Sequence, residues 1–194
     1  MIAKDKKNPF FTRRSVRRFK QDPISESFLI DCVNCARLSP SGKNLQPIEY
    51  IIVTYPEIRN ELFSCLHWAG YLKPSWKPND DEQPMAYIVP ILKKNVSPVG
   101  PYDVGIALAH IVLYAEENNI GSCIIQNIDK ADIQHLLRIP QDYDIGGVVA
   151  LGAKKEHPVL EIDDDNRKYY LDEDNVLHVP KRPLQSLLHK QHYS

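Results

Sequence analysis

The stretch with the clearest potential for chemistry is residues 39–47, Ser-Pro-Ser-Gly-Lys-Asn-Leu-Gln-Pro. Ser41, Asn44 and Gln46 offer both hydrogen-bond donors and acceptors without carrying charge. Such groups suit the mixed polar edge of a neutral heterocycle better than they suit a phosphate or a metal ion. Pro, Ser, Gly and Asn are also the usual residues of turns, so an ordinary turn after a helix is the alternative.

A second candidate is the basic segment, residues 12–20, which packs five basic side chains into nine positions between Ser and apolar residues. A solvated face and a nucleic-acid-binding arm are the alternatives for such a run. The whole chain has a net charge of -1 and a pI near 6.6, which argues against binding to nucleic acid or to an anionic membrane. Because the guanidinium fork suits phosphate oxygens and ring carbonyls, a phosphorylated ligand is the sharper hypothesis.

Other reactive residues form no recognisable catalytic set. Cys32 and Cys35 have redox-like spacing, but both follow a helical apolar pattern, where free cysteine behaves as a small buried hydrophobe. Their redox role is left open. The sequence contains no GxSxG, HExxH, GxxxxGK[ST] or GxGxxG motif, and its seven histidines are scattered. An enzyme without an evident nucleophile or general base would depend on a cofactor that brings its own reactivity.

Around these residues the pattern alternates between helix and strand. Ser25 is expected to cap a helix that ends near Leu38, directly before residues 39–47. Pro90 indicates that the strand over 85–92 ends there or lies near a sheet edge. Residues 67–84 mix aromatic residues with prolines, as in a lid or binding wall, or in a loop that plugs the core edge. The other predicted elements are a short helix after Asn8, strands over 48–53, 122–125 and 146–152, and helices over 56–66, over 104–118 with Asp103 as cap, and after Asp129.

The C-terminal part differs in character from the rest. Residues 167–171 and 176–179 flank an Asp-Glu-Asp-Asn turn, which predicts a hairpin, and the acidic residues of 161–165 are interpreted as a solvated turn. We expect one unit, with the main domain over 1–160 and a hairpin and arm over 161–194 that packs on a partner subunit. No membrane span or signal-peptide core is evident, so a cytoplasmic protein is expected.

Four motifs, in order, resemble the FMN-dependent nitroreductase family. They are residues 13–17 (Arg-Arg-Ser-Val-Arg), 39–47, 103–107 and 119–123, with a further basic segment at 181–184. The similarity covers about residues 9–152. It implies an α+β, nitroreductase-like three-layer α/β/α fold with a central, mainly antiparallel sheet flanked by helices. It also implies a C-terminal arm exchanged across a homodimer.

The resemblance further implies that FMN is bound between the subunits. Arg13 and Ser15 would meet its phosphate and ribityl end, and Lys181 or Arg182 would reach the phosphate. The pyrimidine edge of the ring would lie near Arg14 and Arg17. The backbone around Ile125 and Gln126 would face flavin N5, and the other subunit would supply Pro40, Ser41, Asn44 and Gln46.

The implied activity is an NAD(P)H-dependent oxidoreductase that passes a hydride through FMN to an acceptor such as a nitroaromatic, a quinone or a flavin in a ping-pong cycle. Residues 68–100 depart most from the family, so the acceptor and the NADH or NADPH preference are left open. Alternatives are a specialised relative, such as a reductive dehalogenase or a metabolite dehydrogenase, and a flavin-binding, storage or redox-sensing protein without turnover. An arginine-rich nucleic-acid module is a third.

Overall fold

A computed structural model describes residues 8–73 and 76–193, so the expectation about a signal peptide at 1–7 lies outside the described residues. The helices are α1 (Pro9–Thr12), α2 (Glu26–Arg37), α3 (Pro56–Ser64), α4 (Gly100–Glu117) and α5 (Lys130–Leu136). The strands are β1 (Phe19–Lys20), β2 (Ile48–Val53), β3 (Ala86–Lys93), β4 (Ile120–Ile125), β5 (Tyr143–Ile145), β6 (Val148–Lys154), β7 (Val159–Ile162), β8 (Tyr170–Leu171) and β9 (Leu177–Lys181).

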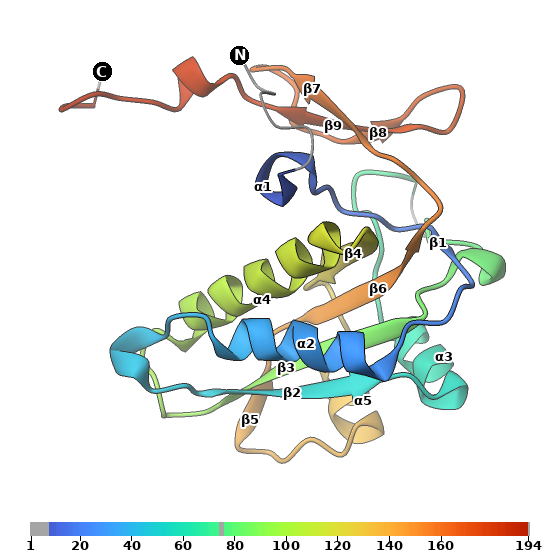
Figure 1. Ribbon diagram of the computed structural model, residues 1–194, viewed down its shortest axis with the longest axis vertical. Helices are drawn as coiled ribbons and strands as arrows, with labels where there is room; N and C mark the ends of the chain where they lie inside the picture. Colours follow the sequence, from blue (N-terminus) through green and yellow to red (C-terminus); the bar gives the residue numbers. More distant parts are fainter. Residues whose placement is uncertain (1–7, 74–75, 194) are drawn as a thin grey trace.

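A six-stranded antiparallel sheet forms the centre of the protein (Figure 1). Strand β3 pairs with β2 along one edge and with β5 and β6 along the other, and β6 also pairs with β4 and β1. The side chains of β3 alternate between the two faces, as the pleat requires. Tyr87 and Val89 belong to one core cluster and Ala86 and Ile88 to the other.

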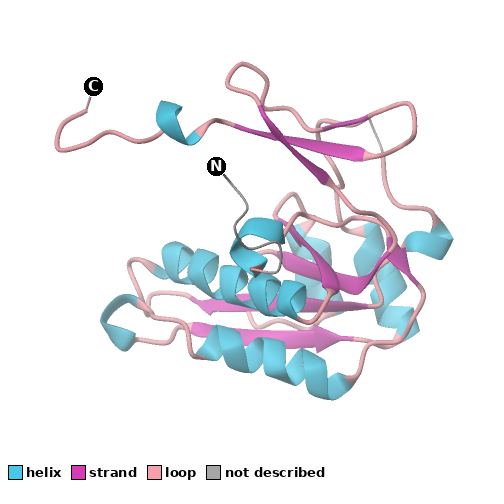
Figure 2. Ribbon diagram, turned by 45° about the horizontal axis from the view of Figure 1, so that its top comes forward, coloured by secondary structure: helices cyan, strands magenta, loops and turns pink. Residues whose placement is uncertain are grey.

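Helices cover both faces of this sheet (Figures 1 and 2). On one face, α2 and α4 bury an apolar stripe that includes Leu29, Leu108 and Ile111. On the other face, α3 and α5 contribute Leu62 and Ile133 to the second cluster. These three layers confirm the predicted α+β class with a central, mainly antiparallel sheet between helices.

The prediction that β3 ends near Pro90 or lies at an edge is wrong, because β3 is a central strand. Proline has no N–H to donate, and it occurs in a central strand only where the ladder is interrupted. That interruption lies between β5 and β6, where Gly146 donates its N–H to the Pro90 carbonyl at 2.9 Å. Gly147 has a φ of +132°, which is open to glycine alone among the common residues.

Among the predicted helix caps, the side-chain caps at Asn8 and Ser25 are confirmed and the one at Asp103 is wrong. The Asn8 side chain accepts a hydrogen bond from Phe10 N (3.0 Å), and Ser25 Oγ accepts one from Phe28 N (3.3 Å). Helix α4, however, starts at Gly100, so Asp103 lies in its first turn and does not cap it. The buried carboxylate of Asp103 instead contacts the loop at 39–47.

The C-terminal residues form a separate three-stranded sheet, which Figure 2 shows standing off from the central sheet. Strand β9 pairs antiparallel with β8, which confirms the hairpin, and parallel with β7. Beyond β9 the chain extends away from the body with three exposed leucines, Leu184, Leu187 and Leu188. Among the described residues, no helix is both long enough and apolar enough to cross a membrane.

Candidate functional site

The loop at 39–47 has an unusual backbone. Lys43, Asn44 and Gln46 adopt φ values of 52°, 56° and 47°, which lie in the left-handed region. This conformation costs roughly 1–2 kcal/mol for each residue other than glycine. Strain of this kind persists only where the surroundings hold it, and it is concentrated at functional sites. An ordinary turn does not require three such residues in four positions.

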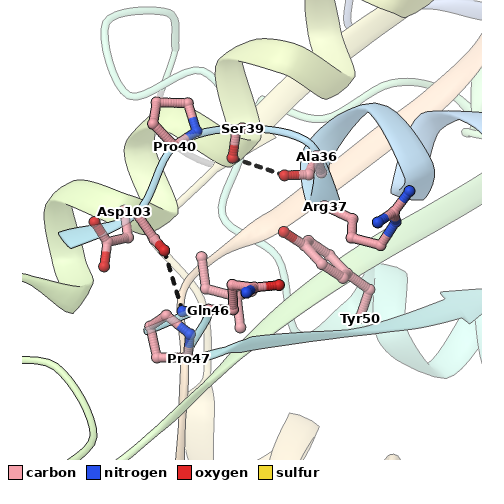
Figure 3. Close-up of a pocket in the computed structure, with 10 residues that line it drawn as sticks. Ala36, Arg37, Ser39, Pro40, Gln46, Pro47, Tyr50 and Asp103 are labelled. Carbon is pink, nitrogen blue, oxygen red and sulfur yellow. Dashed lines mark hydrogen bonds between the residues drawn. The ribbon is translucent and has the colours of Figure 1, made fainter. Parts of the chain in front are cut away.

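Polar contacts hold this loop against α2 and α4. Ser41 Oγ accepts from Gln46 N at 3.1 Å, and Gly42 N donates to Asp103 Oδ1 at 2.9 Å. Ser39 Oγ donates to the Ala36 carbonyl at 2.7 Å, at the edge of a small pocket (Figure 3). The pocket, of about 130 Å³, is lined by Ala36, Arg37, Ser39, Pro40, Ser41, Gln46, Pro47, Ile48, Tyr50 and Asp103. Asn44 and Gln46 are exposed at the loop surface, and Gln46 Nε2 donates to the Asn44 carbonyl at 3.4 Å.

The basic segment is fixed between β4 and a buried glutamate. Val16 is buried and donates its N–H to the Ser122 carbonyl at 2.9 Å. The Glu156 carboxylate accepts from Arg17 N (2.5 Å), Arg18 N (3.3 Å) and Arg18 Nε (3.0 Å). Sequence reasoning missed Glu156. Its signal was an isolated acid that directly follows a buried strand and a Lys-Lys pair.

Arg13 and Arg14 form a cluster of positive charge. Arg14 donates to the carbonyls of Arg13 (2.6 Å) and Phe11 (3.1 Å), and its buried Nε has no partner among the described residues. Burial, and then the neighbouring Arg13 charge, lower the pKa of Arg14, while Glu116 acts in the opposite direction. Two adjacent guanidinium groups that repel each other favour a bound anion.

A second pocket, of about 160 Å³, lies where β4 ends. It brings Arg17 together with Ile125 and Gln126, three residues that were predicted to share a site. Its other walls come from residues 67–70 and from Tyr169 of the C-terminal part. Trp68 is both a pocket wall and a buried core residue, so each interpretation of the irregular segment holds in part. Tyr169 was not predicted, because no local pattern connects it to β4.

One chain does not bring all of the predicted residues together. The loop at 39–47 is bonded to Asp103 in the first turn of α4, whereas Arg14 lines a pocket with Glu116 in the last turn. Thirteen positions along a helix correspond to about 20 Å. The loop and the basic segment therefore lie at opposite ends of α4, too far apart to contact the same flavin ring within one chain.

The basic residues of the tail are held within the C-terminal sheet. Arg182 Nε donates to Asp164 Oδ1 (2.8 Å), which lowers the pKa of that carboxyl, and another guanidinium nitrogen donates to the Ser186 carbonyl (2.8 Å). Lys181 is exposed at the end of β9. The interpretation of the acidic residues of 161–165 as a solvated turn is wrong for Glu161, which lies in β7 and contacts His178, but it holds for Asp164, which is exposed in a bend and pairs there with Arg182.

The cysteine pair shows no sign of redox activation. Cys32 is fully buried in the core between α2 and α4, and Cys35 is half-buried. Desolvation, and then the neighbouring Cys35, raise the pKa of Cys32 to about 12. Reactive cysteines have lowered pKa values, so these thiols are structural.

Comparison with known proteins shows the family and the fold of this chain. A sequence model described as the nitroreductase family matches residues 11–90 and 94–153, including nearly all of the segment expected to depart from it. Iodotyrosine deiodinase from Thermotoga neapolitana is 24% identical over 171 residues, which cover 77% of this chain and 91% of the relative. An FMN-dependent nitroreductase from Clostridium difficile R20291 is similar in structure with a TM-score of 0.71 and 25% identity, covering 96% of this chain and 99% of the other. For the NADPH:FMN oxidoreductase from Vibrio harveyi complexed with NAD⁺, the TM-score is 0.70 at 20% identity, covering 96% and 76%, a likeness of fold.

Proposed function

Because the chain belongs to the nitroreductase family of oxidoreductases, we propose that it is a homodimeric, FMN-dependent enzyme. It takes a hydride from NADH or NADPH and passes the electrons to a second small-molecule acceptor in a ping-pong cycle. The observation that carries the proposal is the pocket at the end of β4, where Arg17 lies beside Ile125 and Gln126. A positive charge beside the end of an edge strand suits the electron-rich, hydrogen-bonding rim of a flavin.

The residues present fit FMN at both of its ends. Arg13 carries charge that a phosphate would neutralise, and Ser15 adds a hydroxyl beside it. The loop at 39–47 offers uncharged donors and acceptors that suit the ring. Lys181 or Arg182 would join the phosphate, although Arg182 must then share its guanidinium with Asp164. When bound, FMN supplies the two-electron redox chemistry that the side chains lack.

The protein itself binds, orients and tunes the cofactor. Arg14 and Arg17 would place positive charge at the pyrimidine edge, where negative charge develops on reduction. The backbone at Ile125 and Gln126 would hold the ring by hydrogen bonds from a strand end, which is rigid. Trp68 and Tyr169 would restrict water and shape the space for the second substrate. We assign no catalytic acid, since protons can come from solvent.

The dimer is supported by the outer face of α4. Between Asp103 and Glu116 the helix carries no Asp, Glu, Lys or Arg, and its one imidazole is that of His110. Its inner stripe is buried, yet Tyr102 (75% exposed) and Ile106 (38% exposed) lie outward, near Gly105 and Ala109. A helix that is apolar all round is normally covered on every side. A second copy of this chain would cover it, and would bring the loop at one end of α4 to the basic segment of its partner.

The visible spectrum of the purified protein tests the proposal. We expect flavin absorption between about 350 and 500 nm, as purified or after incubation with FMN, and anaerobic bleaching by NADH or NADPH. Protein that shows no absorption in this range after incubation with excess FMN and removal of the unbound FMN would refute FMN binding. A yellow protein that neither nucleotide bleaches would instead identify a flavin-binding or sensing protein without turnover. Salt-sensitive RNA or DNA binding without colour would favour the nucleic-acid alternative.

A reductive dehalogenase is the second candidate function. The iodotyrosine deiodinase relative matches over 91% of its own length but at 24% identity, so its support for this alternative is weak. Single-turnover oxidation of the prereduced protein by a halogenated tyrosine, a nitroaromatic or a quinone, compared at equal concentrations, would separate the two. Oxidation of the prereduced protein by the halogenated tyrosine with release of halide, and not by the nitroaromatic or the quinone, would establish the dehalogenase.

A further inference from the structure

The loop at 39–47 is tied to the rest of the fold by the buried side chain of Asp103. This residue is 3% exposed. Its Oδ1 accepts from Gly42 N at 2.9 Å, and its Oδ2 accepts from Ser97 Oγ at 3.3 Å. Ser97 Oγ in turn accepts from Val99 N at 3.3 Å. One carboxylate thus connects the loop, the turn before α4 and the first turn of α4.

The environment of Asp103 explains why an acidic side chain can stay buried there. Both oxygens receive donors, so neither is left without a partner, which would be costly in the interior. The carboxylate also lies in the first helical turn, where the helix macrodipole favours negative charge. Gly42 cannot be replaced readily in this contact, because a Cβ there would lie 2.3 Å from Val99 Cγ2.

The contact occurs next to the strained part of the loop. Gly42 directly precedes Lys43 and Asn44, whose φ values of 52° and 56° are unfavourable for residues with side chains. Such a backbone relaxes unless it is held from both sides. On the far side the loop is held by Ser41 Oγ and Gln46 N at 3.1 Å, and on the near side by Asp103.

We propose that Asp103 is a positioning residue for the cofactor: it holds the loop at 39–47 in the conformation that presents Asn44 and Gln46 to the flavin of the partner subunit. This inference rests on the proposed function. Asp103 itself does not touch the ring. Without it, the loop relaxes and the amide side chains lose their fixed direction, so FMN is bound more weakly and in a less ordered environment.

The test compares FMN affinity and the visible circular dichroism of bound FMN in matched variants. Asp103→Ala should raise the Kd for FMN by roughly 10- to 100-fold, the range for losing a hydrogen bond to a charged group. It should also change the circular dichroism, which reports how the ring is held. Asp103→Asn keeps an oxygen for Gly42 N, so its Kd should remain within about fivefold of wild type. Ser97→Ala removes the hydrogen bonds of Ser97 Oγ to Asp103 Oδ2 and Val99 N but keeps Gly42 N on Asp103 Oδ1, so it should leave the circular dichroism intact.

Glu82→Ala is the matched control for loss of a buried acid. Glu82 is 8% exposed and pairs with Lys155 at 3.2 Å, outside the pockets described above. Both alanine variants should unfold at a lower temperature, but only Asp103→Ala should lose FMN affinity when measured well below that temperature. Equal Kd increases in both variants, a wild-type Kd in Asp103→Ala, or failure of Asp103→Asn to restore binding would overturn the inference. Wild-type protein that binds no FMN would instead refute the proposed function.

Discussion

The guanidinium carbon of Arg17 lies 4.6 Å from the centroid of the Tyr169 ring, so a residue from the N-terminal segment and one from the C-terminal part meet at the same pocket. The Tyr169 hydroxyl also accepts a hydrogen bond from Tyr71 N at 3.3 Å. The two tyrosine rings pack with their centroids 5.1 Å apart. Three segments that are distant in sequence are therefore linked through one aromatic side chain.

Replacing Tyr169 separates these contacts. Tyr169→Ala should lower the free energy of unfolding by about 1–2 kcal/mol, because a cation–π contact and an aromatic pair are lost together. Tyr169→Phe keeps the ring contacts with Arg17 and Tyr71 and should cost only about 0.5–1 kcal/mol from the hydrogen bond. Urea denaturation gives both values. Equal losses in the two variants would show that the hydrogen bond, and not the ring contacts, connects the segments.

Mixing two defective subunits tests whether each cofactor site uses both chains. One variant is Arg13→Ala with Ser15→Ala. The other is Asn44→Gly with Gln46→Gly, since glycine tolerates the positive φ at these positions. Each homodimer should bind FMN weakly. After random exchange of subunits, about one quarter of the sites should recover tight binding, because a heterodimer places both lesions in one site and none in the other. No recovery would place each site within a single chain.

The phosphate assignment makes a separate prediction. Arg13→Ala with Ser15→Ala should weaken FMN binding by on the order of 2–4 kcal/mol, as expected for charge-assisted contacts to phosphate. Binding of riboflavin, which has no phosphate, should change far less. Fluorescence titration of the two flavins measures the difference. An equal loss of riboflavin affinity would show that these residues contact the ring or stabilise the fold and do not bind the phosphate. Unchanged FMN affinity would refute the assignment.

His178 should make the C-terminal sheet sensitive to pH. Its Nε2 lies 2.9 Å from Asp172 Oδ2 and its Nδ1 lies 2.7 Å from Glu161 Oε1, while the Tyr170 ring stacks on it and the Tyr170 hydroxyl donates to Glu161. Hydrogen bonds to Asp172 and then Glu161 raise the pKa of His178. The protonated imidazole is thus favoured in the folded state.

The sign of this effect follows from the raised pKa. The stabilisation is fully present below the ordinary histidine pKa of about 6.5 and is lost as the pH rises through the higher folded-state value. The difference in melting temperature between wild type and His178→Gln should therefore be largest below about pH 6.5 and should shrink at higher pH. Melting curves from pH 5.5 to 9 measure it. A difference that is constant over this range would contradict the assignment.

Local pattern was enough to predict most helices and strands, because each carries its own periodicity and cap. Helix α2 is the clearest example, with Ser25 at its start and an apolar stripe that the structure buries. The errors arose at residues whose role depends on a partner far away in the sequence. Pro90 indicated a sheet edge, but Gly146, between β5 and β6, accommodates it at the centre of the sheet. Asp103 indicated a helix cap, but its partner is Gly42, sixty-one residues away along the chain.

The sequence by itself determined the nitroreductase resemblance, which implied the α+β class, and the residue types suited to phosphate and ring, since the motifs depend on residue types and their spacing. Only the tertiary structure decided how these residues are distributed. It placed the loop at 39–47 and the Arg13–Arg14 cluster at opposite ends of α4, and it brought Tyr169 and Glu156 to the basic segment. Contacts between residues far apart in the chain depend on the packing of whole elements, and no local pattern encodes that packing.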